Sequence, residues 1–460
     1  MKPDFDPLDK AIEKASSGGA TEAEAYLERE LGLTVKVFDG KVERFSYSET
    51  RGIGLRVYLG DRQGRAYTSD LGRVAIEETV GSALAGAEVS PEDPDRRLPD
   101  PSLFGQGTDE GNYLGEDLDI FSDDLERVTA GEKIEFAMGL ERIAREFDPR
   151  ITGVETAAYS ESTSEVLLAS TAGFRSGFRS SICYGYLMAI AEENGDSQTG
   201  FGFTAGRSFD SLDVAAAAEE AASMAVDLLG ARQVETARVP VLIDNLSTAE
   251  MLAMMGAAVS GELVTKGRSY LSERLGDSIA SERITVVDDG LMQGGFGTQP
   301  FDGEGVAAKR KVLVENGTLR TFLHNCYTAS RMGATTTGNA QRQSFRGQVG
   351  VGPTNVFLEP GEETPESLMS GMDRGFMVME LQGVHVGLNP VSGEVSVGAR
   401  GRWVERGRPV HPVREVTIAG TMDDILKGIV GIGNDLRFTP LLGGIGTPSI
   451  LVEGLAVSGK

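Results

Sequence analysis

The N-terminal half of the chain shows the same succession of hydrophobic patterns twice. A short helical segment over residues 7–18 opens the chain, strand-like runs follow, and an apolar stripe at helical spacing over Val74–Ala85 closes the first unit. Strand-like runs then recur and end in an Ala-rich helical segment, Leu212–Leu229. Strands followed by a helix, rather than strict alternation, predict an α+β fold with antiparallel sheets. The strands are expected at residues 23–28, 33–38, 42–47, 53–59 and 65–69, and again at 153–159, 165–170, 174–179, 182–191 and 200–206.

Turn signals support a duplicated unit of antiparallel strands plus a helix. Asp39-Gly40 is typical of a tight hairpin turn. The tetrapeptide Gly195–Gln198 repeats the pattern of Gly60–Gln63 at the matching hairpin of the other unit. Helices within Asp124–Phe147 are expected to join the two units.

A second domain is expected after the Ala-rich helix, because 460 residues are too many for one hydrophobic core. We predict an N-terminal α+β domain over residues 1–235 and a β-rich C-terminal domain with few helices over 236–460. The C-terminal domain opens with a predicted strand, Val239–Asp244, and a predicted helix, Thr248–Leu263. Further predicted features are a strand at Val306–Glu315, a turn at Asn316-Gly317, a strand at Leu319–Leu323 and a capping box at Thr421–Asp424.

Composition narrows the classes of function. The net charge of −25 repels a phosphate backbone and an anionic membrane surface, so no nucleic-acid or membrane partner is expected. The N-terminus has no apolar leader, and no apolar run approaches the roughly 18 residues that span a bilayer. The two cysteines, Cys183 and Cys326, imply no disulfide framework. These features predict a cytoplasmic protein.

Residues for metal or nucleophilic chemistry are few. A catalytic zinc needs about three protein ligands, and His324, His385 and His411 are not at helical spacing from one another. A histidine on a strand is more often a hydrogen-bonded structural residue than a ligand. His324 and Cys326 would share a face of a strand and are conceivable as a nucleophile pair. No orienting acid is evident, and a buried inert cysteine is the commoner situation.

The segment Arg320–Arg342 is the most informative stretch. A strand-like run leads into a short helical turn and then into a loop rich in glycine and hydroxyl residues. Such a loop exposes backbone groups and could hold an extended peptide. The alternative is an ordinary hairpin, helix and loop that support the fold. The candidate contacts with substrate or with a partner subunit are His324, Arg331, Thr337 and Asn339.

Several long motifs accompany this segment, and the sequence resembles the TldD/PmbA family on them. The family is linked to metal-dependent proteolysis and has also been named a modulator of DNA gyrase. The acidic composition favours an indirect effect on gyrase over contact with DNA. The resemblance covers most of the chain and is strongest over residues 240–460. Its motifs are Val286–Gly290, Phe301–Gly305, Val314–Gly317, Arg320–Arg342, Val413–Gly420 and Gly431–Asp435.

The resemblance also locates the family's metal site. Members that resemble active proteases carry H-E-x-x-x-H on a helix after the domain boundary and a cysteine near the C-terminus. In this chain Gly256 and Gly261 stand where the two histidines would be, and Ala257 stands where the glutamate would be. These residues offer no donor atom, residues 434–446 contain no cysteine, and Glu262 alone cannot hold zinc. The resemblance therefore implies the PmbA/TldE-like branch, with no metal ligand in this chain.

Three functions remain open. The resemblance implies a non-catalytic subunit, a pseudo-enzyme, that forms a heterodimer with a TldD-like, metal-bearing subunit. That complex would act on unfolded or extended peptides, with zinc in the partner and no cofactor in this chain. The second is a stand-alone homo-oligomeric peptide-binding or scaffold protein, since an isolated chain could form a homodimer through the surface meant for its partner. The third is a self-sufficient hydrolase with ligands that the sequence does not reveal.

Overall fold

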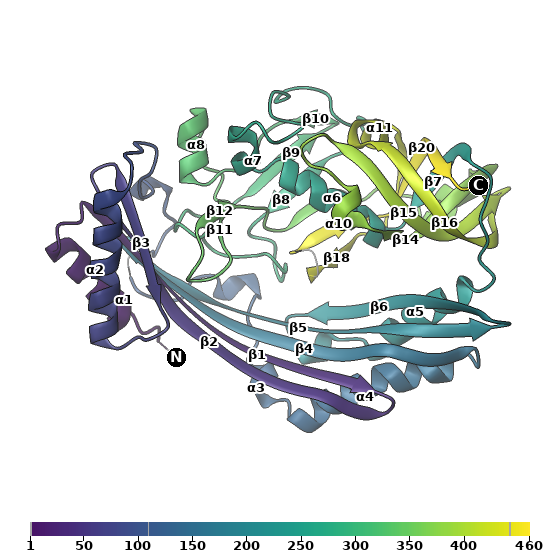
Figure 1. Ribbon diagram of the computed structural model, residues 1–460, viewed down its shortest axis with the longest axis horizontal. Coiled ribbons are helices and arrows are strands. Elements are labelled where there is room, and N and C mark those ends of the chain that lie inside the picture. Colours follow the sequence, from purple (N-terminus) through teal and green to yellow (C-terminus); the bar gives the residue numbers. More distant parts are fainter. Residues whose placement is uncertain (1, 109, 441–442) are drawn as a thin grey trace.

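The computed structural model describes residues 2–108, 110–440 and 443–460. A long curved sheet forms the lower body of the molecule, and the β-rich C-terminal part lies over its concave side (Figure 1). None of the helices in these ranges is long and apolar enough to cross a membrane.

The curved sheet is antiparallel throughout and has the strand order β3-β2-β1-β4-β5-β6. Each half runs from a helix through three strands to a second helix, and the short helix α3 precedes these elements in the second half, so the predicted duplication is present. The two halves meet where β1 pairs with β4, from Glu24 opposite Ser170 to Val37 opposite Ala157. The strands are β1 (Glu22–Phe38), β2 (Lys41–Leu59), β3 (Arg62–Thr68), β4 (Ile151–Ser170), β5 (Arg175–Glu193) and β6 (Asp196–Gly206), and the helices are α1 (Asp6–Ser17), α2 (Arg73–Val89), α3 (Asp124–Arg127), α4 (Ala130–Phe147) and α5 (Val214–Asp227).

The strands are longer than the sequence pattern predicted. The expected pairs of short strands in residues 23–38 and 42–59 are fused into β1 and β2. Gly32 lies between the two strands expected in this region, but in the structure it continues β1 opposite Ser48. A Cβ at Gly32 would lie 2.9 Å from Ser48 Oγ, so the glycine makes room for the side chain on the neighbouring strand. Pairing on both sides therefore overrides the local turn signal.

The Ala-rich helix α5 packs directly on glycines of β6. The buried face of the helix includes Ala217 and Ala221. A Cβ at Gly202 would overlap the carbonyl oxygen of Ala217, and the backbone of Ala221 lies equally close to Gly200. Small residues on both surfaces let the helix approach the sheet closely, which explains the composition of α5.

The C-terminal part holds two six-stranded sheets, ordered β10-β9-β8-β13-β19-β18 and β16-β15-β14-β7-β20-β17, and a separate pair, β11-β12. One large apolar core lies around helix α6 and between these sheets. The strands are β7 (Ala237–Ile243), β8 (Val286–Asp289), β9 (Arg310–Glu315), β10 (Thr318–Leu319), β11 (Ala340–Arg342), β12 (Val349–Val351), β13 (Val356–Leu358), β14 (Arg374–Gln382), β15 (Glu394–Glu405), β16 (Arg408–Thr421), β17 (Ile429–Ile432), β18 (Arg437–Thr439), β19 (Ile445–Thr447) and β20 (Ile450–Ser458), and the helices are α6 (Asn245–Ala258), α7 (Gly261–Thr265), α8 (Cys326–Met332), α9 (Pro365–Ser370), α10 (Val384–Gly387) and α11 (Met422–Lys427).

Two predicted elements of this part differ from the structure. The single helix expected at residues 248–263 is broken, because Ser260 is extended and pairs with Leu323 before α7 begins. The strand expected at 319–323 ends at Leu319 in β10. The Arg320 amide still donates to the Leu313 carbonyl of β9 at 2.8 Å, and Leu323 then pairs with Ser260 at the break. The capping box that opens α11 at Thr421 is confirmed. The turn at Asn316-Gly317 is also confirmed, with φ of 47° and 75°.

Aromatic side chains join the two bodies. Phe301 packs edge-on against Phe174 and Phe178 of the curved sheet, with ring centroids 4.8 and 5.2 Å apart. Phe345 lies on β2 where Gly52 and Gly54 leave room for it: a Cβ at Gly54 would overlap the carbonyl oxygen of Phe345. The long loops of the C-terminal part are thereby held on one end of the sheet.

We predict that Gly54→Ala destabilises this joint. The added methyl group must displace the Phe345 backbone, at a cost of about 1–3 kcal/mol in the free energy of unfolding. Urea denaturation with tryptophan and tyrosine fluorescence measures the change. Gly81→Ala in α2 is the matched control: its Cβ meets no atom within 4 Å, so it should stabilise by up to about 1 kcal/mol. Equal midpoints for the Gly54 variant and the unchanged protein would contradict the packing.

Candidate functional site

The break between α6 and α7 places the residues that the sequence predicts to correspond to the family's metal motif. Gly256 and Ala257 lie in the last turn of α6, and Gly261 begins α7. The amide of Gly261 donates a 2.7 Å hydrogen bond to the Leu323 carbonyl. A Cβ at Gly261 would lie 2.5 Å from His324 Nδ1. The His324 imidazole therefore fills the space that a histidine side chain at position 261 would need.

His324 itself is held as a structural residue. It is 3% exposed, its Nδ1 lies 3.1 Å from the Thr328 hydroxyl, and its amide donates a 2.7 Å bond to Thr337 Oγ1. Burial lowers its pKa, so the ring stays neutral near pH 7. His411 is bound to the carbonyl of Pro412 on β16. Across residues 2–108, 110–440 and 443–460, no group of three or more His, Cys, Asp or Glu side chains is arranged to hold a metal.

Cys326 does not form a nucleophile pair with His324. It opens α8 after the helix cap Asn325 instead of following His324 along a strand. Its amide donates a 2.9 Å hydrogen bond to Glu304 Oε2. Burial, followed by the charge of Glu304, raises the pKa of the thiol far above its usual range. A reactive cysteine needs the opposite shift, because the thiolate is the nucleophile.

The other predicted contact residues fall into two environments. Asn339 is fully buried, donates to Asp288 Oδ2 at 2.8 Å and to the Gly352 carbonyl at 3.0 Å. Thr337 is buried and bound to the His324 backbone. Neither side chain can touch a substrate or a partner subunit in this structure. Arg331 on α8 is half-exposed and lies 3.5 Å from Asp95, so it is accessible, and its contact with substrate or partner stays a prediction.

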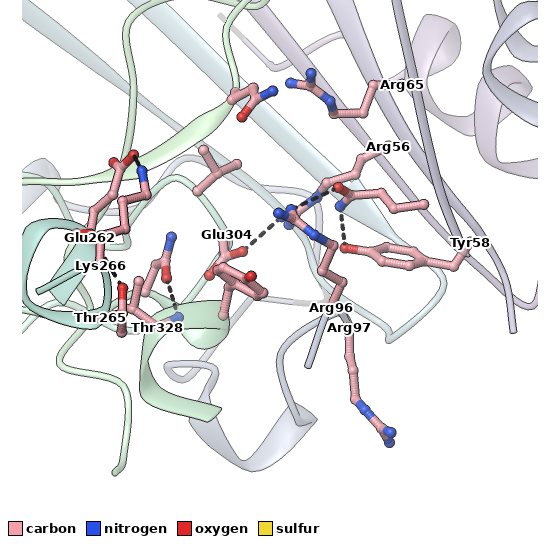
Figure 2. Close-up of a pocket in the computed structure, with 15 residues that line it drawn as sticks. Arg56, Tyr58, Arg65, Arg96, Arg97, Glu262, Thr265, Lys266, Glu304 and Thr328 are labelled. Atoms are coloured by element: carbon pink, nitrogen blue, oxygen red, sulfur yellow. Dashed lines mark hydrogen bonds and ion pairs between the residues drawn. The ribbon is translucent and has the colours of Figure 1, made fainter. Parts of the chain in front are cut away.

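A polar cavity of about 170 Å³ lies between the curved sheet and the C-terminal part. Arg56, Tyr58 and Arg65 enter it from β2 and β3, and Glu262 and Lys266 face them from α7 and the residue after it (Figure 2). The cavity is therefore next to the degenerate metal motif. The sequence analysis did not predict that residues of β2 and β3 line this cavity. A sequence feature that could have indicated it is Arg56, a charged residue inside the apolar run 53–59.

Arg56 connects the two bodies by a buried ion network. Its Nη1 donates to Glu304 Oε1 at 2.8 Å, and its Nη2 donates to Glu24 Oε2 at 2.7 Å. Arg342 pairs with the other oxygen of Glu24. Burial alone would lower the pKa of Arg56, but the charges of Glu24 and Glu304 raise it well above its usual value. The same arginine outweighs burial at Glu304 and lowers the pKa of that carboxyl.

Asp302 of the motif Phe301–Gly305 binds backbone amides of the surrounding loops. Asp302 accepts backbone amides of Glu304, Val306 and Ala340, at 2.9 to 3.0 Å. Burial, followed by repulsion from Glu304, raises the pKa of Asp302. Such a carboxyl holds its own loop and the start of β11 together at one point, which gives the motif Phe301–Gly305 a structural role.

A second cavity, of about 520 Å³, lies between the second half of the curved sheet and the C-terminal part. Its lining combines Met224 and Met377 with several acids. Burial, followed by repulsion from neighbouring acids, raises the pKa of Glu250 to about 7. Burial likewise raises the pKa of Asp244 to about 7, although the cap of α6 at Ser247 opposes the shift.

Known proteins resemble this chain along almost its whole length. Models of the PmbA/TldA metallopeptidases match it as domain 1 (23–87), central domain (123–229) and C-terminal domain (236–459). Metalloprotease PmbA of Escherichia coli O157:H7 is 28% identical over 98% of this chain and 96% of that protein. A metalloprotease TldD homolog of Haemophilus influenzae is 25% identical, over 92% of this chain and 89% of that protein.

Solved structures share the fold. A Thermotoga maritima protein, described as a proposed modulator of a DNA gyrase, superposes with a TM-score of 0.89 at 27% identity and covers 98% of this chain and 99% of its own. TldE of Thermococcus kodakarensis has a TM-score of 0.87 at 23% identity, covering 98% and 100%. The chain therefore belongs to the PmbA/TldD family of metalloprotease-like proteins. The family models separate residues 23–87 from 123–229, whereas the structure joins both in one sheet.

We predict that Arg56→Met strongly destabilises the protein. The substitution leaves Glu24 and Glu304 buried with one of their counter-ions missing, which costs about 3–5 kcal/mol in the free energy of unfolding. Urea denaturation measures the loss. Arg73→Met is the control, because Arg73 pairs with Glu77 on the exposed face of α2 and its loss should leave the midpoint unchanged. A midpoint of Arg56→Met equal to that of the control would show that the network contributes nothing.

We also predict a pH-dependent loss of stability through Glu250. A raised pKa means that the folded protein holds a proton that the unfolded chain releases, so stability is full at low pH and falls as pH rises through about 7. Glu250→Gln should therefore lose less thermal stability than the unchanged protein between about pH 5 and pH 8. Differential scanning calorimetry measures this difference. Glu219→Gln, on the exposed face of α5, should follow the unchanged protein, and parallel curves for all three would contradict the assignment.

Proposed function

We propose that this chain is the non-catalytic, PmbA/TldE-like subunit of a cytosolic TldD-type zinc metallopeptidase complex that acts on unfolded or extended peptides. The observation that carries the proposal is the packing at Gly261. Gly261 has no side chain that could bind a metal, and the neutral ring of His324 fills the space beside it. Gly256 has no such obstacle, since its Cβ would meet only Pro353 at 3.6 Å.

The family membership supports the role of the missing partner. The chain is similar over most of its length both to proteins named PmbA and to proteins named TldD homolog. A metal-bearing partner of the second kind would share this architecture, and two subunits of similar fold can enclose a substrate chamber between them. Zinc in the partner would supply the hydrolytic chemistry, and this chain would supply walls that hold the peptide.

The test is reconstitution with the TldD-type homologue of the same genome that carries H-E-x-x-x-H. Each subunit is purified alone and after co-expression, and the assembly is measured by light scattering, the zinc content by mass spectrometry and the peptidase activity on an unfolded casein fragment. We expect a heteromeric complex in which zinc and activity depend on the partner's motif. The partner's Glu→Gln variant should keep the complex and abolish hydrolysis.

Controls on this chain address hidden ligands. His385→Gln and His411→Gln should leave the zinc content and the activity of the complex unchanged, because neither residue lies in a metal-binding cluster within the described ranges. Stoichiometric zinc on this chain alone, removable by a chelator with loss of activity, would disprove the proposal. A chain that pairs only with itself and never with the homologue would instead favour the scaffold function.

A further inference from the structure

The cavity beside α7 adjoins a further cavity of about 310 Å³, and Arg56, Arg65 and Val349 line both. We call the two adjoining cavities together the arginine groove: Arg56, Arg65 and Arg96 line the first, and Arg342 and Arg346 line the other. The groove thus gathers cations within a chain whose net charge is −25.

The charges of the groove are only partly compensated. Arg56 and Arg342 are neutralised by Glu24 and Glu304 inside the ion network. Arg96 pairs with Asp93 and stacks on Tyr327, 4.3 Å from the ring centroid. These contacts fix the walls of the groove and leave other cations in excess.

Arg65 and Arg346 are the uncompensated cations. In the part of the chain that the structure describes, neither forms an ion pair, and the guanidinium of Arg346 rests on the ring of Phe345. Arg65 is exposed on the wall of the groove, and partial desolvation of its guanidinium together with the charges of Arg96, Arg56 and Arg342 lowers its pKa. Every influence on Arg65 thus opposes its charge, and a bound anion would relieve that repulsion.

Arg56 adds an unused donor at the same place. Its side chain is 6% exposed, and its Nε has no hydrogen-bond partner among the described residues. A buried donor without a partner costs free energy unless a ligand satisfies it. Figure 2 shows Arg56 and Arg65 directed into the cavity from the strands, opposite Glu262 and Lys266.

The shape of the groove suits an extended chain. Val349 belongs to β12, which among the described residues pairs with β11 in a sheet of two strands. The Val351 carbonyl of β12 already accepts from Ser260 Oγ at 3.3 Å, whereas Val349 lines both cavities, so an extended peptide can add to the strand beside Val349. The negative charge of the whole protein would repel the continuous phosphate backbone of a polynucleotide. A peptide is repelled less, because it carries its carboxylates as separate groups.

We infer that the arginine groove binds a carboxylate of an extended peptide, with Arg65 and Arg346 as its ligands. The carboxylate is the peptide's C-terminus or an acidic side chain, and a guanidinium fork can bind either with two parallel hydrogen bonds. The inference rests on the proposed function in taking a peptide as the substrate, and it adds that acidic peptides are preferred. The groove borders α7, so the bound peptide would lie beside the degenerate metal motif.

The test measures binding of fluorescein-labelled octapeptides to the isolated full chain by anisotropy. The probes alternate glycine with glutamate or with glutamine, and each is made as a free acid and as an amide. We expect the glutamate probes, the free-acid probes or both to bind about tenfold more tightly than the neutral amide. Binding should weaken as salt is added, because the contacts are ionic and partly exposed. A gain from glutamate assigns the side chains, and a gain from the free acid assigns the C-terminus.

Variants then locate the site. Arg65→Gln and Arg346→Gln should each weaken binding of the favoured probe about fivefold, and the double variant should bind it no better than the neutral amide. Arg65→Lys should retain part of the affinity, because it keeps the charge and loses the fork. Arg73→Gln on α2 is the matched surface control and should change nothing. Thermal unfolding of each variant confirms that the fold is intact.

The inference is overturned if the charged probes bind no better than the neutral amide, if none binds measurably, or if the groove variants behave like Arg73→Gln. Its failure is separable from that of the proposed function, which is read from assembly and zinc content. A chain that assembles with its homologue but shows no preference for carboxylates refutes the inference alone. A chain that prefers carboxylates but never assembles refutes the proposed subunit role alone.

Discussion

The molecule depends on one buried charge, the guanidinium of Arg56 between Glu24 and Glu304. The two carboxylates belong to different bodies, so this network joins them, together with pairs such as Arg437 with Glu220. An ion pair out of water contributes little net stability but is costly to break. It therefore favours the arrangement of the curved sheet and the motif loops that keeps the guanidinium between both carboxylates. The aromatic rings around Phe301 supply the apolar area on which that register is set.

The sequence predicted the elements whose pattern is local. The turn at Asp39-Gly40 and the capping box at Thr421 are decided by residues within a few positions of one another, and each is present. The duplicated unit is also present, because its pattern of strands and a helix occurs twice along the chain. Strand length was underestimated, because partners far along the chain carry β1 through Gly32. The break after Ala258 was missed for the same reason, since Leu323 lies more than sixty positions away.

The candidate site, too, could be predicted only in part from the sequence. The sequence alone shows that Gly256, Ala257 and Gly261 have no side-chain donor atoms. The His324 ring closes the space at position 261, and only the folded structure brings His324 there. Asn339 was expected to touch a ligand because it lies in a polar loop, yet its amide is consumed by Asp288 and Gly352. Loop polarity in this family segment reports internal hydrogen bonding as much as recognition.

The contact between Gly261 and His324 couples the two positions. A larger side chain at position 261 needs a smaller one at position 324, because either change alone leaves a collision or a hole. Substitutions at the two positions are therefore expected to be strongly non-additive, so that each residue restricts which side chains the other position accepts.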